Sequence, residues 1–226
     1  MRVGLLIVAT GKYLRAAELL IDSACAHLLD GHDFEPFVFT DQDVTGTRGA
    51  HVIPWRAGPW PDGTIQRYHA YWQHRARYEH LDFLLAIDAD MRFVATVGEE
   101  IVSELTAVEH PGFVGKRGPY EERAESVAYV GPSEGERYYC GGVVGGRPAE
   151  FLGLARRLSR AVDTDRARGV IATWHDESHL NRQLATRPPA KVLSTAYCYP
   201  QGCAWFRPTE AAKIVALTKD HAEMRG

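Results

Sequence analysis

The feature that most constrains the fold is an unbroken apolar run over residues 83–87, Phe-Leu-Leu-Ala-Ile, which stops abruptly at residues 88–90, Asp-Ala-Asp. A strand with one solvent-exposed face alternates polar and apolar residues, whereas a strand that is buried on both faces does not. Strands of the second kind belong to sheets that are covered by helices on both sides. The run therefore predicts a central strand over residues 82–87 in an α/β protein.

Strand and helix patterns alternate around this run. We expect strands over residues 1–10, 34–40 and 51–54, helices over residues 13–29, 66–80, 150–168 and 174–184, and loops over residues 55–64 and 112–135. This alternation predicts an α/β sandwich with a mostly parallel sheet. With 226 residues and no repeat or linker, we expect one domain over residues 1–226.

Composition excludes several classes of protein. A net charge of −3 leaves no basic footprint, so we expect no nucleic-acid partner. The four cysteines form no CxxC pair, which favours a reduced, cytoplasmic protein over a disulfide scaffold. The apolar N-terminus leads into Gly11-Lys12 without a cleavage pattern, and no stretch approaches the roughly 20 apolar residues of a membrane span. We therefore expect neither a signal peptide nor a transmembrane segment.

The first chemical signal is the pair of carboxylates, Asp88 and Asp90, directly after the central strand. Ligands of open α/β sheets bind outside the carboxyl ends of the strands. Two carboxylates separated by one residue can jointly hold Mn²⁺ or Mg²⁺, and that cation can bridge the phosphates of a nucleotide diphosphate. The alternative is a turn with two solvated aspartates, which an isolated pair of this spacing usually is.

The second signal is the segment 174–181, Trp-His-Asp-Glu-Ser-His-Leu-Asn. Asp176 and Glu177 fall in the first turn of the expected helix, where the helix dipole favours ionised carboxylates. Glycosyl transfer needs such a group, as a nucleophile or to stabilise an oxocarbenium-like centre. The alternative is an N-capped surface helix. His175 and His179 also have the i, i+4 spacing of a zinc pair, but neither an HExxH motif nor an evident third ligand accompanies them.

The third signal is the segment 138–146, Tyr-Tyr-Cys-Gly-Gly-Val-Val-Gly-Gly. Paired glycines let a ligand or another backbone approach closely. The segment matches neither GxGxxG nor a P-loop, which disfavours a dinucleotide or ATP cradle. A tight strand–bulge–strand is the alternative, and it is compatible with a sugar pocket.

Together the motifs resemble glycosyltransferase family 6, the retaining α-1,3-galactosyl and N-acetylgalactosaminyl transferases that include the histo-blood-group A and B enzymes and bacterial relatives. The similarity covers nearly the whole chain, and segment 174–181 is its most specific part. It also runs through Tyr13 and residues 37–41, 88–91, 110–113, 138–146, 191–194 and 219–225. The resemblance implies a GT-A fold and metal-dependent transfer of GalNAc or Gal, in α linkage, from UDP to the 3-hydroxyl of a galactoside, fucosylated or not.

The resemblance implies a role for each matched position. Glu177 would be the catalytic carboxylate beneath the anomeric carbon and would also touch the acceptor, which His110 and Trp174 would cradle. Asp88 and Asp90 would ligate Mn²⁺, or Mg²⁺, bound to UDP. The other implied donor-site residues are Val8, Ala9 and Tyr13 around the uridine, Asp176 on the sugar hydroxyls, and Arg67, Ala89, Cys140, Gly141, Gly142 and His175. The alternatives are that His110 is a turn residue before Pro111-Gly112, that Tyr13 packs at the start of a helix and that Arg67 is a solvated side chain on a polar helix.

The C-terminal segment, residues 213–226, would act as a lid. Lys219, His221 and Arg225 match residues that close over the UDP phosphates, and such closure excludes water. A frayed terminus with solvated charges is the alternative.

Two departures from relatives shape the expectations. Many bacterial members carry NxN in place of DxD and work without metal, so the two aspartates here predict metal dependence. Vertebrate members carry an N-terminal anchor and stem, whereas this chain starts at the first strand. In the family, the positions of Cys140 and Gly142 discriminate the donors. Gly142 leaves room for an N-acetyl group and favours UDP-GalNAc, whereas Cys140 fits neither donor pattern.

Two other functions compete with a transferase. The aspartate pair could serve a metal-dependent nucleotidyltransferase or phosphohydrolase, although no glycine-rich phosphate loop follows the first strand. A decayed transferase that only binds carbohydrate is the other, but each expected catalytic residue type is present. The sequence leaves the natural acceptor and the oligomeric state open.

Overall fold

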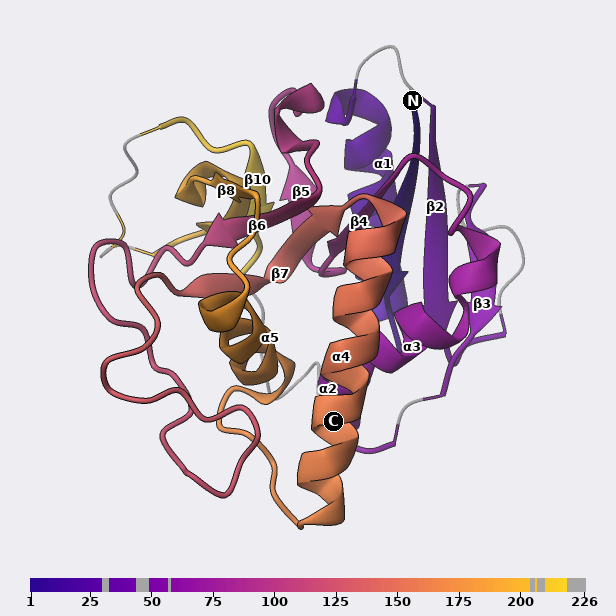
Figure 1. Ribbon diagram of the computed structural model, residues 1–226. Helices are drawn as coiled ribbons and strands as arrows, with labels where there is room; N and C mark the ends of the chain where they lie inside the picture. Colours follow the sequence, from indigo (N-terminus) through magenta and orange to yellow (C-terminus); the bar gives the residue numbers. More distant parts are fainter. Residues whose placement is uncertain (30–32, 44–48, 57, 204–205, 207–209, 219–226) are drawn as a thin grey trace.

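The computed structural model describes residues 1–29, 33–43, 49–56, 58–203, 206 and 210–218. Its centre is a seven-stranded sheet (Figure 1). The strands are β1 Arg2–Val8, β2 Asp33–Thr40, β3 His51–Pro54, β4 Phe83–Ile87, β6 Leu105–Glu109, β7 Tyr139–Gly146 and β8 Lys191–Leu193, in the spatial order β3-β2-β1-β4-β7-β6-β8. β7 runs antiparallel to both of its neighbours, and the other pairs are parallel. The α/β class and the mostly parallel sheet are thus confirmed.

Helices cover both faces of this sheet, with α3, α4 and α5 in front of it in Figure 1 and α1 behind it. The helices are α1 Tyr13–His27, α2 Asp62–Ile65, α3 Arg67–Gln73, α4 Pro148–Ala167 and α5 His175–Thr186, and the 3₁₀ turns are η1 Arg75–Arg77, η2 Glu99–Ile101 and η3 Thr195–Cys198. A second, three-stranded sheet consists of β5 Met91–Phe93, β10 Ile214–Ala216 and β9 Tyr199–Pro200 in that spatial order. Among the helices in the described ranges, none is long and apolar enough to cross a bilayer.

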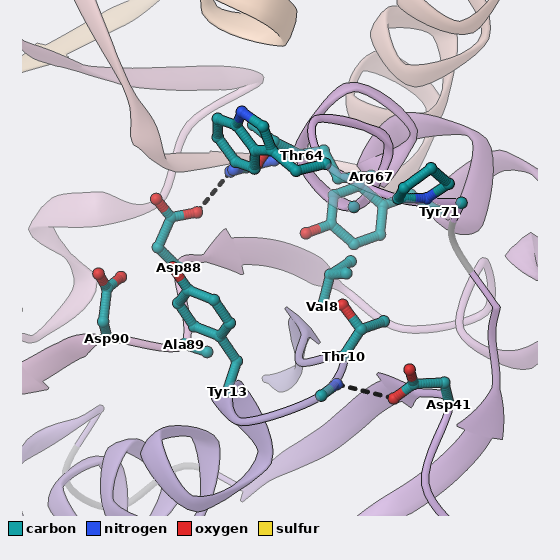
Figure 2. A pocket seen from close by; sticks show the side chains of 15 residues that line it. Val8, Thr10, Tyr13, Asp41, Thr64, Arg67, Tyr71, Asp88, Ala89 and Asp90 are labelled. Atoms are coloured by element: carbon teal, nitrogen blue, oxygen red, sulfur yellow. Dashed lines mark hydrogen bonds and ion pairs between the residues drawn. The ribbon is translucent and has the colours of Figure 1, made fainter. Parts of the chain in front are cut away.

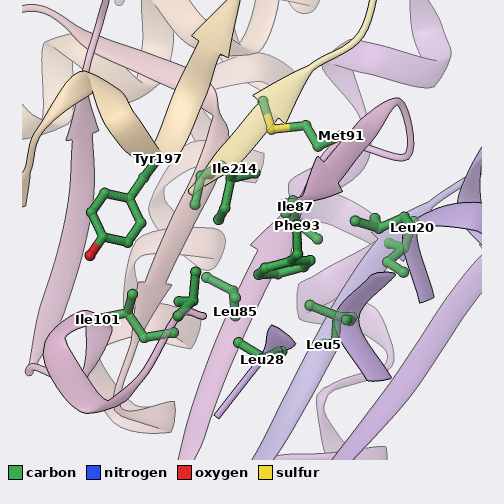
Figure 3. Close-up of a cluster of buried hydrophobic side chains, with 14 of the residues drawn as sticks. Leu5, Leu20, Leu28, Leu85, Ile87, Met91, Phe93, Ile101, Tyr197 and Ile214 are labelled. Atoms are coloured by element: carbon green, nitrogen blue, oxygen red, sulfur yellow. The ribbon is translucent and has the colours of Figure 1, made fainter. Parts of the chain in front are cut away.

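The central strands β1 and β4 feed two separate hydrophobic cores. Leu5 and Leu85 point to one face, where they pack with α1 and the second sheet (Figure 3). Leu6 and Leu84 point to the other face and pack with α3, α4 and α5. Successive side chains of a strand alternate between faces, so a strand with a core on each side is apolar throughout. This explains the unbroken apolar run of β4.

One predicted helix is shorter in the structure. We expected a helix over residues 66–80, whereas α3 ends at Gln73 and η1 follows it. The Tyr78 hydroxyl donates a 2.5 Å hydrogen bond to the carbonyl of Tyr71. That carbonyl is the acceptor a continuous α-helix would offer to Arg75, so the buried tyrosine replaces a helical hydrogen bond and ends the helix.

The segment 112–135 is irregular, as expected, but it is not simply a surface loop. Glu121 is buried and accepts hydrogen bonds from the backbone and hydroxyl of Thr173 at 2.7 and 3.0 Å. Ser126 is also buried and donates to Asp165, which lies near the end of α4. These bonds attach the segment to α4 and to the residues that lead into α5.

Candidate active site

The site lies where the carboxyl ends of β1 and β4 meet the amino end of β7. Because β7 is antiparallel, its first residues, and not its last, lie beside Asp88. The Asp88 backbone N–H donates to the carbonyl of Gly142 at 2.9 Å. The topology therefore brings the aspartate pair and the glycine segment to one edge of the sheet, as the rule for ligand sites in α/β sheets leads one to expect.

A cavity of about 420 Å³ opens at this edge (Figure 2). Six of the predicted donor-site residues line it, namely Val8, Tyr13, Arg67, Asp88, Ala89 and Asp90. Ala9 follows Val8 but is fully buried in the core and does not face the cavity. The volume falls in the range typical of small-molecule pockets.

Several lining residues were not predicted from the sequence. Asp41, at the end of β2, accepts a 2.8 Å hydrogen bond from the N–H of Gly11, whose φ of +56° forms the turn after β1. Trp60 and Thr64 come from the glycine- and proline-rich loop and α2. The Trp60 ring is 46 % exposed and meets His175 edge-on at 5.2 Å. The signal in the sequence that could have found this wall is a tryptophan within the glycine- and proline-rich stretch 55–64.

A second cavity of about 180 Å³ adjoins the first. The two cavities share Thr64, Arg67 and Asp88. The second is completed by residues of both remaining motifs, Gly141, Gly142, Trp174, His175, Asp176 and Glu177. The structure thus gathers the three sequence motifs around one continuous hollow. His175 has a φ of +52°, an uncommon conformation that tends to occur at functional sites.

Arg67 is the cation at the centre of the site. Its side chain is 15 % exposed, so it is not the solvated helix residue that was the alternative interpretation. Its Nη1 lies 2.5 Å from Asp88 Oδ1 and 3.2 Å from the carbonyl oxygen of Gly141, and its Nε lies 3.0 Å from Asp176 Oδ2. Burial raises the pKa of Asp176 to about 6, and the Arg67 charge opposes that rise.

Glu177 is held by both of its carboxylate oxygens. The Tyr138 hydroxyl donates to Oε1 at 3.0 Å, and the Gly141 N–H donates to Oε2 at 2.8 Å. Burial raises the pKa of Glu177 to about 7, and these two hydrogen bonds oppose the rise because they stabilise the ionised form. The carboxylate is therefore oriented, desolvated and close to its titration point at neutral pH.

Asn181, the last residue of the helix motif, fixes α5 against β7. Its Oδ1 accepts from the Tyr139 N–H, and its Nδ2 donates to the Tyr139 carbonyl, both at 2.8 Å. The same Nδ2 donates to the Glu177 carbonyl at 3.0 Å. These bonds set the position of the helix turn that carries Glu177.

Of the two remaining predicted acceptor residues, Trp174 lines the second cavity, whereas His110 lines neither cavity. His110 is in a turn, since its Nδ1 accepts from the Gly112 N–H at 3.0 Å. Its ring also packs against Phe113 and Tyr138, with centroids at 4.9 and 5.7 Å. Burial lowers the pKa of His110 to about 4, so the ring is neutral at physiological pH. Trp174 is 50 % exposed at the mouth of the second cavity.

Other predicted residues do not gather here. Cys140 is buried in the core and lines neither cavity. His179 is buried, and its Nε2 lies 3.6 Å from Asp165 Oδ2, away from His175. In the part of the chain that the structure describes, no group of three or more His, Cys, Asp or Glu side chains is placed so that it could hold a metal ion by itself. The predicted lid residues Lys219, His221 and Arg225 fall outside the described residues.

Comparison with known proteins gives one consistent family. The model of "Glycosyltransferase family 6" matches residues 1–226. The chain is 35 % identical to the histo-blood group ABO system transferase 1 of Rattus norvegicus, over 99 % of this chain and 68 % of that protein. It is 34 % identical to the globoside alpha-1,3-N-acetylgalactosaminyltransferase 1 of Canis lupus familiaris, over 87 % of this chain and 60 % of that protein. It is 33 % identical to the human alpha-1,3-galactosyltransferase 2, over 87 % of this chain and 62 % of that protein.

Proposed function

The chain belongs to glycosyltransferase family 6, and from that premise we propose that it is a retaining enzyme that transfers GalNAc or Gal from UDP to the 3-hydroxyl of a galactoside in α linkage. One observation carries the proposal. The oriented carboxylate of Glu177 lies in a cavity that shares Asp88 and Arg67 with a larger, nucleotide-sized one. Family membership does not favour a nucleotidyltransferase or phosphohydrolase.

The larger cavity suits the UDP part of the donor. Tyr13 lines it at a position from which its ring can stack on a base, and Val8 lies beside it. Asp88 and Asp90 offer the hard oxygen ligands that Mn²⁺ or Mg²⁺ prefers, and diphosphate oxygens and water can supply the rest. When bound, such an ion neutralises the charge of the departing diphosphate. Of the expected lid, residues 213–226, Ile214–Ala216 form β10 of the second sheet, so a lid over the phosphates would have to come from the residues after β10, most of which lie outside the described ranges.

The smaller cavity suits the transferred sugar. Its wall of Gly141 and Gly142 has no side chain, which leaves room for a 2-acetamido group and favours UDP-GalNAc. Asp176 would accept hydrogen bonds from the sugar hydroxyls. Glu177 would support the anomeric carbon while its bond to the UDP oxygen breaks. The acceptor hydroxyl then bonds to that carbon and gives its proton to the departing UDP, with the acceptor ring held between His110 and Trp174.

The cofactor, donor and location are separable parts of this proposal. Cys25, Cys140, Cys198 and Cys203 are free thiols, which supports a reducing compartment, and we propose the cytoplasm. UDP release from purified protein should be measured with UDP-GalNAc and UDP-Gal in parallel, with Mn²⁺ or EDTA, and with or without a fucosylated galactoside. Donor-selective release that needs Mn²⁺ supports the donor and the cofactor parts. Release in EDTA contradicts the metal assignment alone, and failure to bind UDP at all contradicts the assignment of the cavity.

A further inference from the structure

Tyr138 has no role in the reaction described so far, yet its hydroxyl touches the catalytic carboxylate. The residue directly precedes β7, is 1 % exposed, and donates a 3.0 Å hydrogen bond to Glu177 Oε1. Burial raises the pKa of the Tyr138 hydroxyl far above its ordinary value, and the negative charge of Glu177 raises it further. The phenol therefore stays protonated when Glu177 is ionised, and it is the donor in its bond to the carboxylate.

The ring of Tyr138 cannot move independently of its surroundings. Three aromatic rings meet it edge-on, those of His110, Phe113 and Tyr120, with centroids at 5.7, 5.4 and 5.1 Å. The backbone of Gly118 closes the cage, since a Cβ atom there would lie 2.2 Å from Cγ of Tyr138. A tyrosine that is packed on all these sides has a fixed hydroxyl position, so it can aim a flexible glutamate side chain.

The two ends of Tyr138 face different parts of the site. Its hydroxyl reaches Glu177, and its ring contacts His110, the residue assigned to the acceptor. The other carboxylate oxygen, Oε2, is held by the Gly141 backbone. With one donor on each oxygen, the plane of the Glu177 carboxylate is fixed. One of these donors, Tyr138, packs against His110, the residue assigned to the acceptor.

We propose that Tyr138 is a positioning residue that fixes the orientation of Glu177 and ties it to the acceptor side of the site through His110. This inference rests on the proposed transferase function. It predicts that loss of the hydroxyl slows the chemical step without weakening donor binding, because the donor cavities are lined by other residues.

Tyr138→Phe in the full-length chain tests the inference. We expect kcat to fall about 10- to 100-fold, the loss typical of one hydrogen bond to a charged group, with KM for the UDP-sugar changed less than about 2-fold. The Tyr138 hydroxyl lowers the pKa of Glu177, whereas the charges of Asp176 and Asp88 raise it. Since the variant loses the hydroxyl and keeps both aspartates, the pKa of Glu177 should rise, and the acidic limb of the kcat profile should move to higher pH.

Tyr120→Phe is the matched control. Tyr120 is buried in the same aromatic cluster, but its hydroxyl donates to the Arg137 carbonyl at 2.8 Å and not to Glu177, so this variant should keep the wild-type kcat and pH limb. An equal fall in kcat in both variants would show general loss of packing and overturn the inference. A wild-type kcat in Tyr138→Phe would also overturn it.

A second substitution covers the case in which Tyr138→Phe does not fold. 3-Fluorotyrosine in place of Tyr138 keeps the ring and the hydroxyl but makes the hydroxyl a stronger donor. The acidic limb should then move to lower pH, and an unmoved limb would count against the inference. If the wild-type chain itself transfers no sugar while it binds UDP, the proposed function fails, and that result is distinct from any difference between the variants.

Discussion

The carboxamide of Asn181 pairs with the backbone of Tyr139 as a neighbouring strand would, through one accepted and one donated hydrogen bond of 2.8 Å each. A side chain thereby satisfies the backbone of β7 at the strand's first residue, beyond the last pair that β4 makes with β7. Asn181 lies one helical turn after Glu177, whose carbonyl it also binds. The link makes the position of the proposed catalytic carboxylate depend on a residue that lines neither cavity.

Asn181→Ala should therefore destabilise the protein. The variant leaves a buried N–H and a buried carbonyl of Tyr139 without these bonds, which costs about 2 to 4 kcal/mol in the free energy of unfolding. Urea denaturation measures this cost. Gln183→Ala on the same helix removes only a 3.2 Å bond to Arg157 and should cost less than about 1 kcal/mol. Equal costs for the two variants would show that the Asn181 link contributes nothing special.

Glu177→Gln tests the catalytic assignment. The amide keeps the shape of the carboxylate and can still accept from the Gly141 N–H, but it carries no negative charge to place beneath the anomeric carbon. We expect transfer to fall at least about 100-fold, with UDP affinity close to that of the wild type. Product formation and calorimetric UDP binding measure the two quantities. Turnover near the wild-type rate would remove Glu177 from its role.

The same substitution should change how stability depends on pH. The pKa of Glu177 is raised in the folded state, from 4.5 to about 7, so the folded protein binds this proton more tightly than the unfolded chain. The group's contribution is fully present below about pH 4.5 and is lost as the pH rises through about 7. Between pH 5 and pH 8 the wild type should lose about 2 kcal/mol that Glu177→Gln does not lose.

Urea unfolding of both proteins at pH 5 and pH 8 measures this difference. Asp176 also has a raised pKa, of about 6, but it is present in both proteins and cancels in the comparison. Equal losses in the two proteins would mean that Glu177 is not the desolvated acid described here. A larger loss in the wild type would show that ionising the Glu177 carboxylate lowers the free energy of unfolding.

Much of this fold could be predicted because the residues of its central strands themselves indicate whether one or both faces of the strand are buried. The apolar run of β4 requires a core on each face, and the helix α4 shows its buried stripe at helical spacing. The antiparallel direction of β7 could not be predicted in the same way. Strand direction depends on which strands become neighbours, and Gly145 and Gly146 carry no side chains that would indicate a partner.

The chemistry of the site could also be predicted in part, where short local motifs carry it. Asp88, Asp90, Asp176 and Glu177 stand out because the first two directly follow an apolar strand and the other two fall in the first turn of an expected helix. Tyr138 and Asn181 do not, because their partners lie 39 and 42 residues away in the chain. Aromatic and amide side chains have many ordinary roles, and only the packing of α5 on β7 gives these two a specific one.

The metal assignment predicts a parallel loss in two variants. Asp88→Asn and Asp90→Asn each remove a negative charge from the proposed ligand pair, so the gain in UDP affinity on adding Mn²⁺ should fall at least about 10-fold in both. Titration calorimetry with UDP, in Mn²⁺ or EDTA, measures this gain. Asp163→Asn, on the exposed side of α4, is the control and should keep it. An unchanged gain in both site variants would contradict the assignment.

Gly142→Ala tests the proposed basis of donor choice. A Cβ atom at this position would lie 2.4 Å from the terminal methyl group of Met91 and 3.2 Å from Asp88 Oδ2. Met91 is a flexible side chain whose end can move aside, so the methyl group of alanine should be accommodated at the wall of the sugar cavity. There it takes space that a 2-acetamido group needs and a 2-hydroxyl does not.

We therefore expect the ratio of kcat/KM for UDP-GalNAc to that for UDP-Gal to fall at least about 10-fold in Gly142→Ala, since one misplaced methyl group in a pocket is worth about 1 to 3 kcal/mol. Competition between the two donors measures this ratio directly. Gly153→Ala on α4, outside both cavities, should leave it unchanged. A proportional loss with both donors would show that the added methyl group disturbs Asp88 and that the size of residue 142 does not select the sugar.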